Sequence, residues 1–193
     1  MKKIFSLLLA LLMIFAFSAC GKEEVFDIGK VKDGVYINDY MDIKATLPEG
    51  FEFMSDDEAK KAFGVTELYS DGSAFGYGAF AASETGASLN FTFENTALSR
   101  EEKCTAEGYL NETFDSMFSL SSYCVVDYEK GVMNFGGEDI HYMDIELSVD
   151  IGTDTVEIFE RMAVKEKEEW ICIINAASQY EADIEALFSG IEM

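Results

Sequence analysis

Alternation of apolar and polar side chains is the feature that most constrains the fold of this chain. Two segments, 88–94 and 140–149, carry apolar residues at every second position and polar residues between them. A period of two is typical of a β-strand that buries one face and exposes the other. The apolar residues are Leu89, Phe91 and Phe93 in the first segment and Met143, Ile145, Leu147 and Val149 in the second.

Further strands are predicted along most of the chain, and short turns such as Glu84-Thr-Gly86 and Gly152-Thr-Asp154 join several of them. Neighbouring strands joined by tight turns pair antiparallel. The sequence therefore predicts an α+β domain with a central, mostly antiparallel sheet flanked by helices. The other predicted strands are 34–38, 41–47, 51–53, 76–83, 123–128, 132–135, 156–164 and 170–175.

Three helices are predicted to cover this sheet. Ser55-Asp-Asp-Glu58 has the pattern of a capping box and predicts a short helix to about Phe63. Ser99 and Thr105 are alternative starts for a second helix, and a third helix ends the chain. Apolar residues recur at helical spacing in both of these: Leu110, Phe114, Met117 and Phe118 in the second, and Ile184, Leu187, Phe188 and Ile191 in the third.

The N-terminus has the pattern of an export signal. Lys2 and Lys3 precede an apolar run from Ile4 to Phe17, and the small pair Ser18-Ala19 leads into Cys20. A basic start, an apolar middle and a small-residue cleavage site are typical of a secretory signal. The alternatives are an ordinary signal cut nearby and a transmembrane helix, and the run is shorter than the roughly 20 residues that a membrane span needs.

With its cysteine directly after the small pair, this segment resembles a bacterial lipoprotein signal, although Phe17 stands where that family prefers Leu. The resemblance implies cleavage before Cys20 and a thioether-linked diacylglycerol on its sulfur. The expected organisation is a signal peptide at 1–19, a lipidated cysteine with a polar tether at 20–33, and a single α+β domain at 34–193. The expected location is the extracytoplasmic face of the cell membrane.

Charge narrows the classes of partner. The chain carries 14 Lys and Arg against 37 Asp and Glu, and loss of Lys2 and Lys3 with the signal leaves 12 against 37, a formal charge of −25. Such a surface repels phosphate backbones, so we expect no nucleic-acid partner. Basic proteins, cationic peptides and divalent cations would be attracted. The simplest explanation of the charge is that it keeps an exported domain soluble.

Three cysteines remain after Cys20, and an odd number leaves at least one of them unpaired. Cys172 lies in the apolar run 170–174 and is predicted to be a buried free thiol. Cys104 and Cys124 flank the predicted second helix and are either bridged or reduced. No CxxC pair is present, so the sequence supports neither a thioredoxin-type motif nor a zinc ribbon.

The order of elements from 34 to 191 resembles that of PsbP/Mog1-like domains. The matching motifs are Tyr36-Ile-Asn-Asp-Tyr40, then Ile43 and Leu47-Pro-Glu-Gly-Phe51, where the family has Pro-x-x-Trp. Thr105-Ala-Glu-Gly-Tyr-Leu110 resembles the helix start that follows in such domains and in lipoproteins of Firmicutes. The resemblance implies an α/β/α sandwich. It transfers no functional residue, because one fold serves unrelated functions.

Catalytic motifs are not apparent in the sequence. His141 is the sole histidine, and its phase with Met143 predicts a structural, inward-facing residue. There is no GxSxG elbow, no phosphate-binding glycine spacing and no calcium-loop pattern among the acidic clusters. The glycine-aromatic stretch around Gly76 and Gly78 is read as close backbone packing. We therefore expect neither an enzyme nor a bound cofactor.

Three functions remain as hypotheses. The leading one is a lipid-anchored accessory or binding module that recruits an envelope protein, and an exposed aromatic patch would favour it. The second is a small-ligand carrier or hydrolase with an apolar cavity, which a pocket with polar groups around His141 would favour. The third is a weak divalent-cation binder, which requires converging carboxylates. The tyrosines considered for the aromatic patch are Tyr36, Tyr40, Tyr77 and Tyr128.

Overall fold

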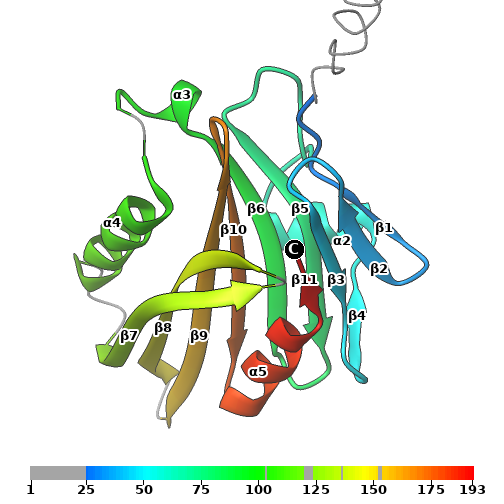
Figure 1. The fold of residues 1–193 in the computed structure, drawn as a ribbon. Coiled ribbons are helices and arrows are strands. Elements are labelled where there is room, and N and C mark those ends of the chain that lie inside the picture. The colour runs from blue at the N-terminus through cyan, green and yellow to red at the C-terminus, as the bar shows by residue number, and fades with distance from the viewer. Residues whose placement is uncertain (1–24, 103, 120–123, 136, 152–153) are drawn as a thin grey trace, which may run out of the picture.

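The computed structural model describes residues 25–193 apart from 103, 120–123, 136 and 152–153, and within these the chain forms two antiparallel sheets (Figure 1). The larger has seven strands and the smaller has four. The expected α+β class with a central antiparallel sheet is confirmed. The large sheet has the order β4 (Phe51–Phe53), β5 (Phe75–Ser83), β6 (Ser88–Asn95), β10 (Trp170–Ser178), β9 (Asp154–Lys167), β8 (Glu138–Ile151) and β7 (Cys124–Phe135), and the small one β1 (Lys30–Lys32), β2 (Val35–Asn38), β3 (Ile43–Thr46) and β11 (Ile191–Glu192).

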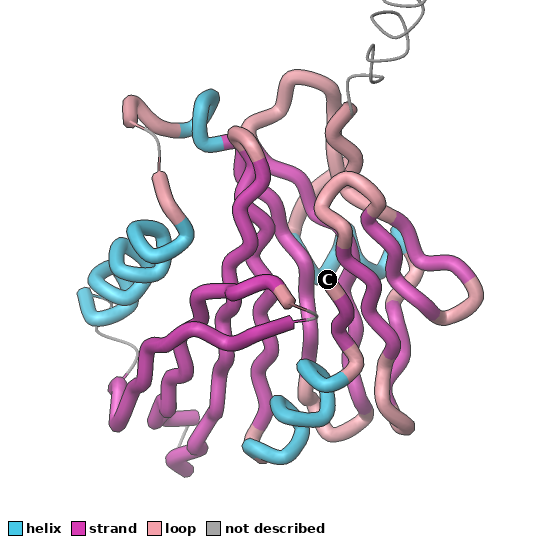
Figure 2. Tube along the Cα trace, in the orientation of Figure 1, coloured by secondary structure: helices cyan, strands magenta, loops and turns pink. Residues whose placement is uncertain are grey.

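Different elements cover the two faces of the large sheet (Figure 2). One face carries α4 (Ala106–Ser119), which packs on β8 and β9, and α2 (Asp56–Phe63), which packs on β5. The other carries the small sheet together with α5 (Glu181–Ser189). A single helical turn, α3 (Thr96–Ser99), follows β6. One outer layer is thus helical, as the sandwich resemblance implies, and the other combines a sheet with one helix.

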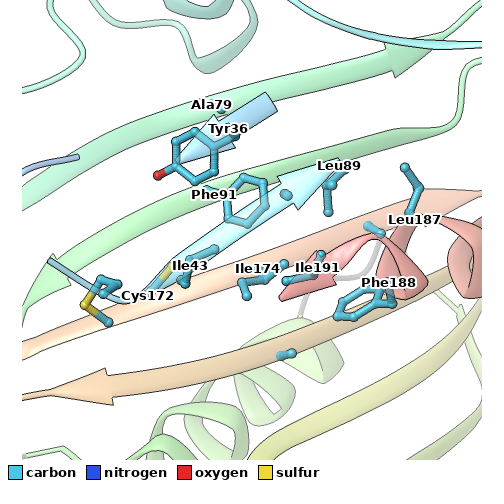
Figure 3. Close-up of a cluster of buried hydrophobic side chains, with 14 of the residues drawn as sticks. Tyr36, Ile43, Ala79, Leu89, Phe91, Cys172, Ile174, Leu187, Phe188 and Ile191 are labelled. Atoms are coloured by element: carbon cyan, nitrogen blue, oxygen red, sulfur yellow. The ribbon is translucent and has the colours of Figure 1, made fainter. Parts of the chain in front are cut away.

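The main hydrophobic core lies between the large sheet and the small one. Figure 3 shows Tyr36, Phe91, Cys172 and Leu187, which four different elements contribute to this core. The layers approach so closely at Gly78 that a Cβ atom on it would lie 2.5 Å from the Tyr36 hydroxyl oxygen. Only glycine fits such an approach without moving its neighbours. The close backbone packing predicted for the glycine-aromatic stretch is therefore confirmed.

A second core lies under α4 on the opposite face. Leu110 of α4 packs with Met143, Ile145 and Leu147 of β8, and all four are buried. The strand alternation predicted for 140–149 is confirmed, since these residues share one face. His141 is on the same face near the start of β8, but it is only half-buried.

Several element boundaries differ from those expected. The capping box at Ser55 is present, whereas Ser99 starts no long helix because its hydroxyl bonds to Glu94 and to the backbone of Asn95. Helix α4 begins after Thr105 instead, whose hydroxyl accepts from the Gly108 amide. Strand β7 is continuous across the break expected after Tyr128, because it pairs with β8 along its whole length.

Of the expected tether at 20–33, the described residues 26–32 pack on the domain. The Phe26 ring stacks on Trp170 at 3.4 Å between centroids and meets Tyr40, Tyr69 and Phe93 edge-on. The backbone carbonyls of residues 27 and 28 accept hydrogen bonds from Asn38 and from the Tyr36 hydroxyl, and Lys30–Lys32 forms β1. Four aromatic partners for one side chain explain why the chain is held here. These residues are therefore held by the domain and do not form a tether.

Candidate functional site

A hollow of about 230 Å³ opens between α5 and the outer strands of the large sheet. Its lining is strongly acidic, with six carboxylates and a single guanidinium among the described residues that form it. We call it the acidic hollow. It is lined by Asp127, Tyr128, Glu129, Asp144, Ile145, Glu146, Phe159, Glu160, Arg161, Glu181 and Ile184.

The strand register brings like charges face to face in the acidic hollow. Asp127 of β7 is directly opposite Glu146 of β8, and Glu129 is directly opposite Asp144. Paired residues of antiparallel strands point to the same face, with Cβ atoms about 4.5–5.5 Å apart, and like charges in such pairs are destabilising. Two such pairs in succession cost stability. Packing therefore does not explain why these residues occupy this face.

Arg161 of β9 offsets part of this charge. Its guanidinium donates two hydrogen bonds of 2.7 Å to Asp144, and it also pairs with Glu185 of α5 at 2.8 Å. The rings of Tyr142 and Phe188 lie 5.5 and 5.3 Å from its central carbon. The hydrogen bond to Asp144 is the main cause that raises the pKa of Arg161, which keeps it cationic. Arg161 is thereby fixed between a strand and a helix at the base of the hollow.

The pKa values of two groups near the hollow are raised. Burial raises the pKa of Tyr142, and the nearby charges of Glu129 and Asp144 raise it further. Burial also raises the pKa of Glu160, against the opposing effect of a hydrogen bond from Asn175, but Glu160 is opposite the buried Ile145 and so faces the α4 side of the sheet. The shift of Tyr142 shows that the carboxylates of the hollow disfavour a further negative charge beside them.

The surroundings of His141 are polar and open, with a second hollow of about 350 Å³ beside it. Its other polar lining residues come mainly from the start of α4 and from β8 and β9. Glu166 accepts a hydrogen bond of 2.8 Å from the Ala106 amide, and Thr105 accepts one of 3.1 Å from the Gly108 amide. Both side chains therefore serve the N-terminus of α4, a common use of such residues. This arrangement favours a structural role for these groups over a hydrolytic one.

The three cysteines after Cys20 are all free thiols, so Cys104 and Cys124 are not bridged. Cys172 is completely buried, as predicted, and burial raises the pKa of its thiol. Cys124 is exposed at the start of β7. The predicted lipidation site, Cys20, lies outside the described residues.

The four tyrosines considered for an aromatic patch do not share an exposed face. Tyr36 and Tyr40 are buried, because the first small-sheet hairpin turns them onto the main core. Tyr77 packs half-buried on Phe63 of α2. Tyr128 is the member that is exposed, and it lies on β7 beside the acidic hollow.

Two further features of the described residues concern metal ions and membranes. Within the described residues, no group of three or more His, Cys, Asp or Glu side chains is placed to hold a metal ion. In the same part of the chain, no helix combines the length and apolarity that crossing a bilayer requires. The carboxylates of the acidic hollow are thus spread along a surface and do not converge on one point.

Comparison with known proteins finds similarity at the level of fold. The chain matches no protein-family model and no curated protein sequence. Among solved structures it is similar to LpqN, involved in cell envelope biogenesis of Mycobacterium tuberculosis, with 8% identity over 77% of this chain and 76% of that one and a TM-score of 0.44. It is also similar to the cyanobacterial PsbP of Synechocystis, with 11% identity over 91% of this chain and 97% of that one and a TM-score of 0.45.

Proposed function

We propose that this protein is a lipid-anchored accessory module on the extracytoplasmic face of the cell membrane, and that its acidic hollow recruits a basic segment of an envelope protein. The observation that carries the proposal is the pair of like-charge contacts between β7 and β8, Asp127 with Glu146 and Glu129 with Asp144. A binding module is proposed and not an enzyme, because two polar groups of the hollow next to His141, Glu166 and Thr105, hold the start of α4.

Electrostatics supports a basic partner. Each like-charge pair costs about 0.2–1 kcal/mol in the free protein, and a cationic segment bound between the strands relieves that cost. Complementary charge also speeds encounter and selects against acidic partners. A row of carboxylates on two strands suits several Lys or Arg side chains of one segment better than a single metal ion, which needs converging ligands. The proposed ligand is therefore an extended cationic segment.

Binding of defined peptides to the full-length chain, purified from membranes in detergent, tests this role. The probe is a fifteen-residue Lys-rich peptide, with a Glu-rich peptide of equal length as its counterpart. We expect salt-sensitive binding of the Lys-rich peptide by calorimetry, and about tenfold weaker binding by the double variant Glu129→Gln, Glu146→Gln.

A matched control separates the hollow from the total charge. Glu52→Gln with Glu67→Gln removes the same charge from exposed positions on and after the first edge strand, away from the hollow. Binding should change by less than twofold in this control. Equal losses in both double variants would reduce the effect to net charge and would contradict a site at the hollow.

The anchor has its own test. The full-length protein is expressed in a Gram-positive host beside Cys20→Ala, and the mass of its N-terminal peptide is measured. A diacylglycerol adduct on Cys20, lost together with membrane retention in the variant, is the expected result. An unmodified peptide found free in the medium would make the protein a secreted one and would overturn the anchoring part of the proposal.

A further inference from the structure

We infer that the partner segment binds as an additional β-strand on the free edge of β7, and that it alternates basic and apolar residues. The inference rests on the proposed function, since it specifies how the basic segment is held. Strand addition supplies affinity through main-chain hydrogen bonds and specificity through alternate side chains. Three observations on β7 point to it.

The first observation is the length and exposure of the edge. β7 ends the strand order of the large sheet and runs for 12 residues, whereas the opposite edge strand, β4, has 3. Apolar side chains lie exposed along β7: Val126 at 56%, Tyr128 at 51% and Val132 at 53%. Proteins usually shorten or cover a long edge, because its unpaired backbone groups can pair with another strand.

The second observation is the alternation of chemistry along β7. Asp127 and Glu129 face the acidic hollow, opposite Glu146 and Asp144 of β8. The intervening Tyr128 is opposite Ile145, which is buried in the core under α4, so it faces the other side of the sheet. A strand added beside β7 would present every second side chain to Asp127 and Glu129. Its remaining side chains would lie beside Tyr128, Lys130 and Val132, and Lys130 is already engaged by Asn111 of α4 at 2.8 Å. This favours basic residues in the first set and apolar residues next to Tyr128 and Val132 in the second.

The third observation excludes the simplest competing occupant on charge. A second copy pairing antiparallel through β7 about Tyr128 would set Asp127 of one chain opposite Glu129 of the other. Each copy also brings the excess of acidic over basic residues of the whole sequence. Both features oppose self-pairing, and both favour a basic segment from another protein.

Two peptides of equal composition test the inference on the full-length protein. One alternates Lys and Val over nine residues, and the other places all its Lys residues before all its Val residues. We expect the alternating peptide to bind at least fivefold more tightly. We also expect it to slow amide hydrogen exchange along Cys124–Phe135, as added strand hydrogen bonds would.

The outcomes separate the two proposals. Equal, salt-sensitive affinities with unchanged exchange of β7 would overturn strand addition and leave the basic-segment function standing. Absence of binding by either peptide would overturn both. Concentration-dependent dimers without peptide would identify a second copy as the occupant and would overturn the basic segment.

Substitution on the apolar side of the edge gives a second readout. Val132→Lys places a charge where an apolar peptide residue should lie, and it should reduce the preference for the alternating peptide to less than twofold. Val31→Lys makes the same change on β1, where valine is also exposed, and should leave the preference intact. Because both valines are exposed, neither variant should unfold the protein. An unchanged preference in Val132→Lys would contradict the proposed alternation.

Discussion

The face of the large sheet that meets the small sheet is divided into two regions of opposite character. Over β5, β6 and β10 it is apolar and closely packed, with Phe91 and Cys172 fully buried and Gly78 admitting no side chain. Over β9, β8 and β7 the same face carries Arg161 and those carboxylates of the acidic hollow that come from β7 and β8, with α5 beside them. One continuous sheet thus provides a closely packed apolar region and a region where acidic side chains are opposite one another and only partly offset by Arg161.

The two regions should therefore respond in opposite ways to substitution. Removing a side chain from the packed region loses buried contacts, so stability falls. Removing a charge from the acidic hollow relieves repulsion, so stability rises while binding of a basic segment falls. A trade between stability and function of this kind is common at binding sites.

The largest effect is expected for Phe91→Ala. Phe91 is completely buried and its ring lies 4.5 Å from that of Tyr36, so the change leaves a cavity in the main core. We expect the free energy of unfolding to fall by about 3–5 kcal/mol, measured by urea denaturation. Tyr180→Ala, at an exposed position, serves as the control and should stay within about 0.5 kcal/mol of the wild type. A loss below about 1 kcal/mol at Phe91 would contradict the division into two regions.

A smaller loss, about 2 kcal/mol, is expected for Phe26→Ala, because its ring is half-buried but packs on several aromatic neighbours. Trp170 is the sole tryptophan of the chain, so its fluorescence reports directly on the stacked ring. Emission should change in the folded variant. Phe75→Ala changes an exposed phenylalanine at the start of β5 and should leave the emission unchanged. Unaltered emission in both variants would show that Phe26 does not pack on Trp170 in solution.

Glu160→Gln tests, through pH, a carboxylate of β9 that faces the α4 side of the sheet. Because burial raises the pKa of Glu160 in the folded state, the folded protein binds this proton more tightly than the unfolded chain does. The contribution of Glu160 to stability is thus complete below the unfolded value near 4.3 and is lost as pH rises through the folded pKa. Glutamine should therefore stabilise the protein at pH 7, and the gain should vanish near pH 4. A gain that is the same at both pH values would contradict the assigned ionisation.

The smallest effect is expected for Glu129→Gln. Relief of one like-charge pair with Asp144 should raise the free energy of unfolding by about 0.2–1 kcal/mol at low salt. The gain should be smaller at 1 M salt, because the Debye length is then only about 3 Å and the repulsion is screened. Glu52→Gln on β4 is the control and should show no comparable gain. Destabilisation by Glu129→Gln would show that this carboxylate is compensated in the free protein.

Much of the fold was predictable because its signals are local. Alternation at Leu89, Phe91 and Phe93 identified a strand, and the capping box at Ser55 identified α2. The sequence left open whether the four tyrosines form a patch, because Tyr36 and Tyr40 occupy a hairpin whose buried face depends on a distant sheet. The start of α4 was ambiguous because Ser99 and Thr105 offer equivalent local patterns, which only the tertiary bonds of Ser99 resolve.

The acidic hollow was missed for a related reason. Asp127 and Glu129 alternate on one strand, and Asp144 and Glu146 alternate on another, which was a usable signal of an acidic face. Which carboxylates oppose one another depends on the register between β7 and β8, including a bulge between Val125 and Asp127. Register is set by packing across the whole sheet, so composition alone suggested only a solvated surface.

The aromatic clasp on Phe26 also fixes how far the module can reach. If Cys20 carries the lipid, six residue steps separate it from Phe26, and a fully extended chain covers about 20 Å in that distance. The domain would then lie close to the bilayer, with the end that carries Phe26 and Trp170 turned towards the lipid. A basic segment that binds β7 would then belong to a protein close to the membrane. The short link between lipid and domain thus restricts the choice of partner, as the charge of the hollow also does.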